Sequence, residues 1–263
     1  KDFKHPYADR EIEWDIAKSL WVESHLDKFD PEKLKVLKRF IQNFKDNLHL
    51  YQNLEKSIIH NDINDNNIIV TNDFLNPSVK SVIDFGDSVF SQTINDLAIT
   101  CSYGIMNLND PLSGCIDILK GYNQNRSVKD DELKLLYNLI AMRLVISVTK
   151  SSINRYIEPD NKYLLISEKS AWDLLCKWSE IDSEFAYYSF RKACSLDAHS
   201  SKKKFDKWAK KNRFLIGDLL PGINKTKFYN LDLSIGSNWL GTRNEIEDLD
   251  FFQFKIEKLQ KTI

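Results

Sequence analysis

Apolar residues recur at helical spacing near the start of the chain. In REIEWDIAKSLW they stand four apart, at Ile12, Ile16 and Leu20, which is the period of an amphipathic helix. A second segment, PEKLKVLKRFIQNFKDNLHLY, has Pro31 at its start, where a helix tolerates proline. Its apolar face consists of Leu37, Phe40, Ile41, Phe44 and Leu48. The pattern therefore predicts two helices in this part of the chain.

The spacing of apolar residues then changes to that of short strands. SIIH, NIIV and VKSVIDF are rich in isoleucine and valine and are joined by turns rich in Asn and Asp, so we expect three small strands. Helical spacing returns from Asn95 onward. The sequence therefore predicts an α+β protein that is mainly helical.

The longest predicted helix is DELKLLYNLIAMRLVISVTKSSINRY. One face of it carries Leu133, Leu136, Tyr137, Ile140 and Leu144. A further helix is predicted in SEKSAWDLLCKWSEI, with Ser167 as its N-cap.

The composition of the chain changes beyond about Asp197. HSSKKKFDKWAKKNR is basic, and the segment after it mixes glycine, asparagine and aromatic residues without a clear period. We expect residues 1–197 to form one domain and residues 198–263 to be a linker or the start of a following domain. The lysine run is interpreted as a solvated helix face rather than a site for phosphate groups.

Overall composition excludes several classes of partner. Hydrophobic residues make up 42% of the 263 positions and charged residues 29%, which is typical of a globular domain. With 37 basic and 38 acidic residues the charge is balanced, so we expect neither a nucleic acid nor a membrane surface as partner. The four cysteines have no CxxC spacing, and we interpret them as reduced, mostly buried thiols of a cytoplasmic protein.

One polar stretch lies between two predicted strands, in SIIHNDINDNNIIV. His60, Asp62 and Asn67 form the pattern H-x-D-x-x-x-x-N, and Asp84 follows at the end of the third strand in Asp-Phe-Gly. This order and spacing are those of the protein-kinase catalytic loop and metal-binding motif. Since Asn67 begins one strand and Asp84 ends its neighbour, we expect their oxygens to hold one Mg²⁺ ion together.

The other polar groups of the stretch receive roles from their positions. Asp62, on the loop, faces the point where a substrate hydroxyl would arrive, so we assign it as the catalytic base or orienting group. We also assign His60 to the catalytic site. Its position at the end of a strand favours a hydrogen bond to the backbone that braces the loop over a part in the reaction. Asp96, in the first turn of the next helix, is expected to accept hydrogen bonds from the loop and support it.

The motifs resemble those of the aminoglycoside and choline phosphotransferase family, the small-molecule relatives of protein kinases. HNDINDNN resembles its H-G-D-x-x-x-x-N loop, IDFGD its I-D-[FW]-x-D motif, and NDLA its D-L-A motif. HPYADREIEWDIAKSLW and AMRLVISVTKSS are similar to stretches of the hydroxylysine-kinase-like branch. The resemblance covers residues 3 to 197.

The resemblance implies the fold of a kinase-like C-terminal lobe, with a small β-hairpin that carries the catalytic loop. It implies ATP or GTP as co-substrate, Mg²⁺ held by Asn67 and Asp84, and a small amino alcohol or hydroxylated amino acid as phosphate acceptor. Asn61 departs from the family by replacing its Gly, and Asn tolerates unusual backbone angles better than most residues.

A larger departure concerns the nucleotide lobe. The eight glycines form no G-x-G-x-x-G, and the chain starts at what resembles the second lobe. We therefore expect a fragment of a longer polypeptide, with the N-terminal lobe absent and weak nucleotide binding by the isolated chain. LDLSIGSNWLG resembles the junction to a fused pyridoxal-phosphate enzyme of the class III aminotransferase type.

Four residues are candidates for contact with the acceptor. Trp14, Asp15 and Asp87 could receive an ammonium group, and Arg143, which interrupts the apolar face of the long helix, could receive a carboxylate. Three of them have a plain structural alternative, namely core packing for Trp14 and a buried structural ion pair for Asp15 and Arg143. Asp87 is favoured by its position beside the metal site.

Two other functions use the same residues. Asp62, Asn64, Asn66 and Asp73 resemble the ligands of an EF-hand calcium loop, but Asn67 stands where that loop needs Gly, and the flanks are predicted strands. The second alternative is an inactive kinase-like lobe that serves as a scaffold or regulatory module. Retention of Asp62 together with both metal ligands favours the enzyme.

Overall fold

A computed structural model describes residues 5–73, 75–158 and 168–197, with short pieces beyond them at 203–204, 207, 211, 230–232 and 238–240. The chain divides into two units, Lys1–Ala198 and His199–Ile263. In the second unit the structure describes one pair of antiparallel strands, β5 (Asn230–Asp232) and β6 (Asn238–Leu240). Ser167 and most of the tail beyond residue 197 lie outside the described residues.

The first unit is mainly helical, as the spacing of apolar residues predicted. Its helices are η1 (Ile16–Lys28), α1 (Pro31–Asp46), α2 (Leu48–Gln52), α3 (Ile94–Gly104), α4 (Pro111–Asn125), α5 (Asp130–Ile157), α6 (Glu168–Glu180) and α7 (Ser183–Ala193). Its strands are β1 (Lys56–Ile59), β2 (Ile68–Val70), β3 (Val79–Val82) and β4 (Val89–Gln92), with a short 3₁₀ turn η2 (Phe85–Asp87) between β3 and β4.

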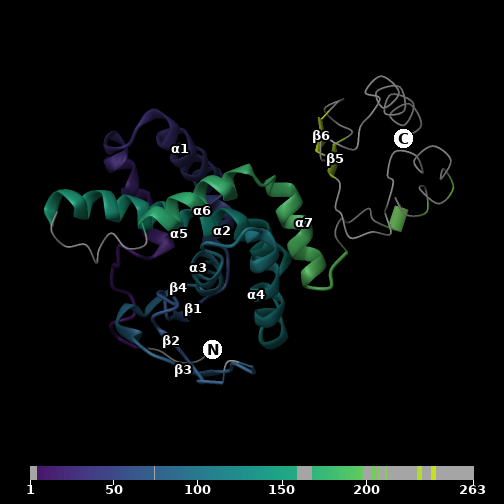
Figure 1. Cartoon of the computed structure of the whole chain (residues 1–263), viewed down its shortest axis with the longest axis horizontal. Helices are drawn as coiled ribbons and strands as arrows, with labels where there is room; N and C mark the ends of the chain where they lie inside the picture. Colours follow the sequence, from purple (N-terminus) through teal and green to yellow (C-terminus); the bar gives the residue numbers. More distant parts are fainter. Residues whose placement is uncertain are drawn as a thin grey trace. The chain divides into compact units, whose positions relative to one another are not determined.

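Helix α5 is the centre of the core. It packs against η1, α1, α3, α6 and α7, and Figure 1 shows it crossing the unit with α1 on one side and α3 with the strands on the other. Almost every side chain from Leu133 to Val148 is buried, so this helix is covered on all sides rather than on one face. The predicted helix is confirmed, but the prediction gave it one apolar face, whereas it is buried on all sides.

Two predicted helix boundaries differ from the structure. Helix α1 ends at Asp46 because the side-chain amide of Asn47 donates to the carbonyl of Asn43 (2.9 Å), and such a local side-chain hydrogen bond favours a helix end. The chain resumes as the separate helix α2. Residues 31–51 therefore form two helices where the apolar period predicted one.

The first predicted helix begins later than expected and is tighter. Asp15 caps its start by accepting a hydrogen bond from the amide of Ala17 (3.0 Å), and the residues that follow form the 3₁₀ helix η1. Its buried residues, Ile16, Ser19 and Val22, stand three apart, which matches the 3₁₀ period rather than the α-helical one.

The strands form two small antiparallel sheets, β1–β4 and β2–β3. In the second sheet Ile68 pairs with Val82, so the start of β2 lies beside the end of β3. The polar loop joins β1 to β2 and therefore connects the two sheets, where the sequence predicted a loop within one hairpin. Strand β4 was not predicted, because its sequence VFSQ has no run of isoleucine and valine like those in the other three strands.

Two further expectations can be compared with the structure. All four cysteines are free thiols, and Cys101, Cys115 and Cys194 are buried whereas Cys176 is exposed. Across the residues that the structure describes, no helix combines the length and the apolar character needed to cross a membrane.

Candidate active site

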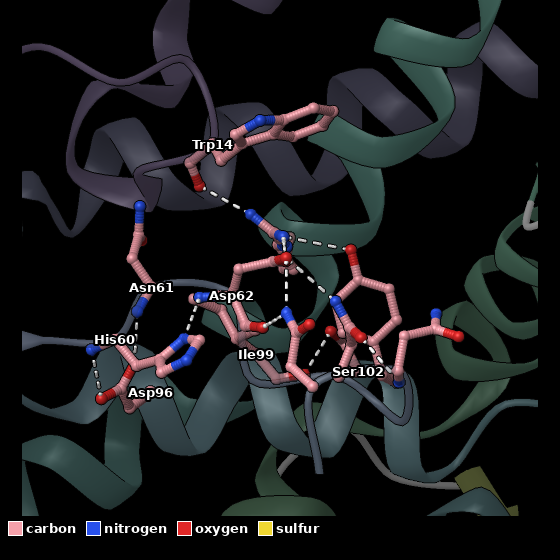
Figure 2. Close-up of polar contacts among 12 residues, drawn as sticks. Trp14, His60, Asn61, Asp62, Asp96, Ile99 and Ser102 are labelled. Carbon is pink, nitrogen blue, oxygen red and sulfur yellow. Dashed lines mark hydrogen bonds and ion pairs between the residues drawn. The ribbon is translucent and has the colours of Figure 1, made fainter. Parts of the chain in front are cut away.

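The polar loop is fixed to helix α3 by Asp96. One carboxylate oxygen of Asp96 accepts a hydrogen bond from the amide of His60 (3.0 Å) and the other accepts one from the amide of Asn61 (2.8 Å). Figure 2 shows Asp96 on its helix with these two loop residues beside it. Burial raises the pKa of Asp96, and the two amide donors oppose that shift. The loop backbone is therefore tied to a first-turn helix carboxylate; its support of catalysis stays a prediction.

His60 joins the loop to the end of strand β3. Its Nδ1 accepts a hydrogen bond from the amide of Asp62 (3.3 Å), so Nε2 carries the proton and donates to the carbonyl of Ile83 (2.9 Å). Its ring also lies 4.8 Å from that of Phe85, measured between centroids. Both ring nitrogens are thus engaged in structure, which is the bracing role; a part in the chemistry itself remains untested.

Asn61 has the left-handed backbone that its place in the motif requires, with φ of 69°. Its side chain is fully buried, and within the described part of the chain neither its amide nitrogen nor its amide oxygen has a hydrogen-bond partner. A glycine would adopt the same backbone without the buried amide. The turn therefore survives the replacement at a cost to stability.

Asp62 lies between two sets of hydrogen-bond donors. Its Oδ1 accepts from Nη2 of Arg143 (2.7 Å), and its Oδ2 accepts from the side-chain amides of Asn64 (3.0 Å) and Asn67 (3.1 Å). The side chain retains 23% exposure. Burial raises the pKa of Asp62, with the charge of Arg143 as the largest opposing cause. The result is a carboxylate held in one orientation that still reaches solvent.

Asn67 and Asp84 lie at the same end of the β2–β3 pair. The amide of Ile83, the residue before Asp84, donates to the backbone carbonyl of Asn67 (3.0 Å). The side-chain nitrogen of Asn67 donates to Asp62, which leaves its carbonyl oxygen for another partner, and Asp84 is exposed in a left-handed conformation with φ of 62°.

The side-chain oxygens of Asn67 and Asp84 suit a metal ion that keeps most of its coordinated waters. Among the described residues, no group of three or more His, Cys, Asp or Glu side chains could hold an ion by itself. Mg²⁺ usually binds one or two protein oxygens and completes its octahedron with waters and nucleotide phosphates. The donor set of Asn67 and Asp84 therefore fits Mg²⁺ delivered with a nucleotide.

Arg143 reaches Asp62 from the core helix α5. Its Nη1 donates to the backbone carbonyl of Trp14 (2.9 Å), and its Nη2 donates to the hydroxyl of Tyr103 (3.1 Å) as well as to Asp62. The guanidinium carbon lies 5.4 Å from the ring centroids of both Trp14 and Tyr103. The residue is 1% exposed. Tyr103 could not be found from the sequence, since a lone Tyr in a helix gives no signal.

The remaining acceptor candidates are divided by the structure. Asp87 is half-buried. Burial is the largest cause that raises the pKa of Asp62, and the negative charge of Asp87 raises it further, whereas the charge of Arg143 lowers it. Trp14 is linked to Asp62 through Arg143, which donates hydrogen bonds to both residues. Nζ of Lys150 lies 5.9 Å from the centroid of the Trp14 ring. Asp15 lies elsewhere, as the next paragraph describes.

Asp15 belongs to a buried polar cluster that links the N-terminal segment to β4 and α3. Its Oδ1 accepts from Ala17, from the hydroxyl of Ser91 (2.8 Å) and from the amide of Asn95 (3.4 Å). It is 3% exposed. These are the contacts of a structural carboxylate, and the ion-pair partner of Arg143 is Asp62 rather than Asp15.

A cavity of about 820 Å³ lies beside the start of the loop, at His60. Its walls include His60, Phe85 and Gly86 together with Tyr7 and Arg10 of the N-terminal segment. Arg10 donates to the backbone carbonyls of Gly86 and Ser88, so this segment is attached to the Asp-Phe-Gly turn.

The calcium-loop alternative does not fit the described geometry. The loop is flanked by strands β1 and β2, where an EF-hand needs helices. The side-chain oxygens of its supposed ligands are used locally: Asn64 accepts from the amide of Asn66 (2.9 Å), and Asp73 accepts from the amides of Leu75 and Asn76.

Comparison with known proteins identifies sequences that are similar to this chain. Residues 4–116 match the sequence model of a family described as "Phosphotransferase enzyme family". Hydroxylysine kinase of Xenopus laevis is 32% identical over 124 residues, 44% of this chain and 33% of the relative. Hydroxylysine kinase of Mus musculus is 23% identical over 187 residues, 65% of this chain and 49% of the relative.

A third relative extends the comparison. Hydroxylysine kinase of Bos taurus is 23% identical over 167 residues, 60% of this chain and 44% of the relative. The chain thus spans between a third and a half of the length of these relatives. The predicted fusion to a pyridoxal-phosphate enzyme is not addressed by these matches and stays a prediction. Residues 4–116 are thus similar to the phosphotransferase enzyme family, and the chain is similar to the hydroxylysine kinases.

Proposed function

We propose that this chain supplies the catalytic and acceptor-binding part of an ATP- or GTP-dependent phosphotransferase. Its acceptor would be the hydroxyl of a small amino alcohol or a hydroxylated amino acid. The observation that carries the proposal is the carboxylate of Asp62, held by Arg143 on one oxygen and by Asn64 and Asn67 on the other. The similarity to hydroxylysine kinases supports the acceptor class.

Asp62 would orient the acceptor and take its proton. Burial raises the pKa of this carboxylate, which makes it a better proton acceptor at neutral pH, while its partial exposure gives an alcohol room to approach. The negative charge of Asp87 acts on Asp62, so the two carboxylates would attract an ammonium group on the acceptor.

Asn67 and Asp84 would hold Mg²⁺ at the strand ends. Bound there, the ion would neutralise charge on the transferred phosphate. Because the side-chain nitrogen of Asn67 donates to Asp62, the metal-binding amide and the base are fixed relative to each other by direct hydrogen bonds. Positioning of this kind is what phosphoryl transfer requires from a protein.

The first prediction concerns Asp62. Transfer of labelled phosphate from ATP or GTP to a panel of amino alcohols and hydroxylated amino acids is measured for the chain and for any longer polypeptide that contains it. Asp62→Ala should lower the rate by a factor on the order of 100 or more, because the general base is removed.

The matched control is Asp65→Ala, which removes an exposed carboxylate from the same loop and should leave the rate close to that of the unmodified protein. Equal rates for Asp62→Ala and Asp65→Ala would contradict the assignment. Absence of transfer in both contexts would favour the inactive scaffold.

A further inference from the structure

The guanidinium of Arg143 faces the carboxylate of Asp62 rather than open solvent. Of its hydrogen-bonding groups, Nη1 is used by the carbonyl of Trp14 and Nη2 by Asp62 and Tyr103. The remaining nitrogen, Nε, is buried and has no partner among the described residues. An acceptor carboxylate therefore finds no exposed donor on this side chain, although the sequence suggested Arg143 as its anchor.

The contacts of Arg143 hold its guanidinium in one place. It lies 5.4 Å from each of the Trp14 and Tyr103 rings and donates to a main-chain oxygen from a different segment. It projects from α5, whose side chains are almost all buried. A flexible side chain fixed in this way can in turn fix the group to which it donates.

We propose that Arg143 is the positioning residue of Asp62 and does not contact the acceptor. It holds Oδ1 of Asp62, so that Oδ2 stays on Asn67, the amide that also carries the metal-binding oxygen. Tyr103, which receives a hydrogen bond from the same Nη2, is the second member of this support. The proposal rests on the proposed function only in treating Asp62 as the base, because the positioning itself can be observed without turnover.

The kinetic test uses Arg143→Met and Arg143→Lys. Both should lower kcat by about a hundredfold with little change in KM for the acceptor, because a misplaced base slows the chemical step without weakening binding. Lysine should not rescue the rate, since an ammonium cannot reproduce the planar fork that reaches Trp14, Tyr103 and Asp62 together. A rise in KM at unchanged kcat would show an acceptor anchor and overturn the proposal, and so would full rescue by lysine.

Arg155→Met is the matched control. Arg155 lies on the same helix α5 but is exposed and paired with Glu168, so its loss should leave kcat and KM unchanged. A loss of kcat equal to that of Arg143→Met would overturn the proposal, because it would reflect damage to the helix rather than release of Asp62.

The second readout needs no activity. The side-chain amide resonances of Asn64 and Asn67 report on Oδ2 of Asp62, and neither residue has a hydrogen bond to Arg143 among those that the structure describes. They should shift or broaden in folded Arg143→Lys and, to a smaller extent, in Tyr103→Phe, a milder variant that keeps the ring. Unchanged resonances in these folded variants would overturn the proposal. Shifted resonances without phosphate transfer in any context would uphold the positioning and reject the proposed function.

Discussion

Asn61 shows how the replacement of a single residue in a motif is accommodated. Asn61 and Asn107 both have left-handed backbones, with φ of 69° and 64°. Asn107 is exposed, whereas the amide of Asn61 is buried and lacks a partner among the described residues. The two positions thus share one backbone cost and differ in the cost of a buried polar group.

This difference gives a stability prediction. Asn61→Gly should raise the free energy of unfolding by about 1 kcal/mol more than Asn107→Gly does, because only the first variant removes an unsatisfied buried amide. Urea denaturation of both variants measures it. If the two glycine variants change stability equally, the buried amide carries no cost.

The placement of residues was predictable from the sequence where the motif fixed it and not where it depended on distant contacts. The separation of Asn67 from Asp84 follows from hairpin pairing, so their shared strand end could be inferred. Arg143 and Asp62 are 81 positions apart. No periodicity links a helix residue to a loop that far away, so the apolar face of α5 could mark Arg143 as unusual but could not name its partner.

At the scale of elements, the start of α5 depends on one buried carboxylate. Glu132 accepts a hydrogen bond from the amide of Lys129 (2.9 Å), which caps the helix, and it is paired with Arg126 at 2.6 Å. Its side chain is 1% exposed, against 23% for Arg126. The cap and the ion pair thus share one side chain.

Removing that carboxylate should loosen the end of the core helix. Glu132→Ala should lower the free energy of unfolding by about 2 kcal/mol or more, because it leaves Arg126 without its closest partner and an amide uncapped. Asp131→Ala, which removes an exposed acid from the same turn, should cost under about 1 kcal/mol. Thermal and urea denaturation test both; equal losses would contradict the capping account.

The elements themselves were predicted where their apolar pattern was distinctive, whatever their length. Helix α5 is long and rich in apolar residues, so its existence and ends could be read from the sequence within one residue at each end. Strand β4, VFSQ, lacks the isoleucine and valine enrichment of the other strands and was missed, whereas the three-residue β2 was predicted. The 3₁₀ helix η1 was mistaken for an α-helix because Ile12, Ile16 and Leu20 satisfy one period while the burial of Ile16, Ser19 and Val22 follows the other.

For the first unit as a whole, Asp15 links the N-terminal segment to the interior. Burial raises the pKa of Asp15, and hydrogen bonds from Ala17 and Ser91 oppose the shift. A raised folded-state pKa means that the group contributes most stability below its unfolded pKa, near 3.8, and that this contribution is lost as the pH rises through the folded value.

Asp15→Asn should therefore become more stable relative to the unmodified chain as the pH rises from about 4, and the difference should level off above the folded pKa. Asp30→Asn is the control with the opposite sign, since an amide hydrogen bond from Lys33 is the leading cause that lowers the pKa of exposed Asp30. Denaturation at a series of pH values measures both. A flat difference for Asp15→Asn would contradict the burial argument.

One contact at the site joins main chain to side chain, and this has a consequence for natural variation. Nη1 of Arg143 donates to the backbone oxygen at position 14, not to the indole. Every amino acid offers that oxygen, so a substitution at position 14 removes the indole but leaves the acceptor for Nη1 of Arg143 in place. The identity of the side chain there can therefore drift over evolution without releasing the guanidinium that holds Asp62.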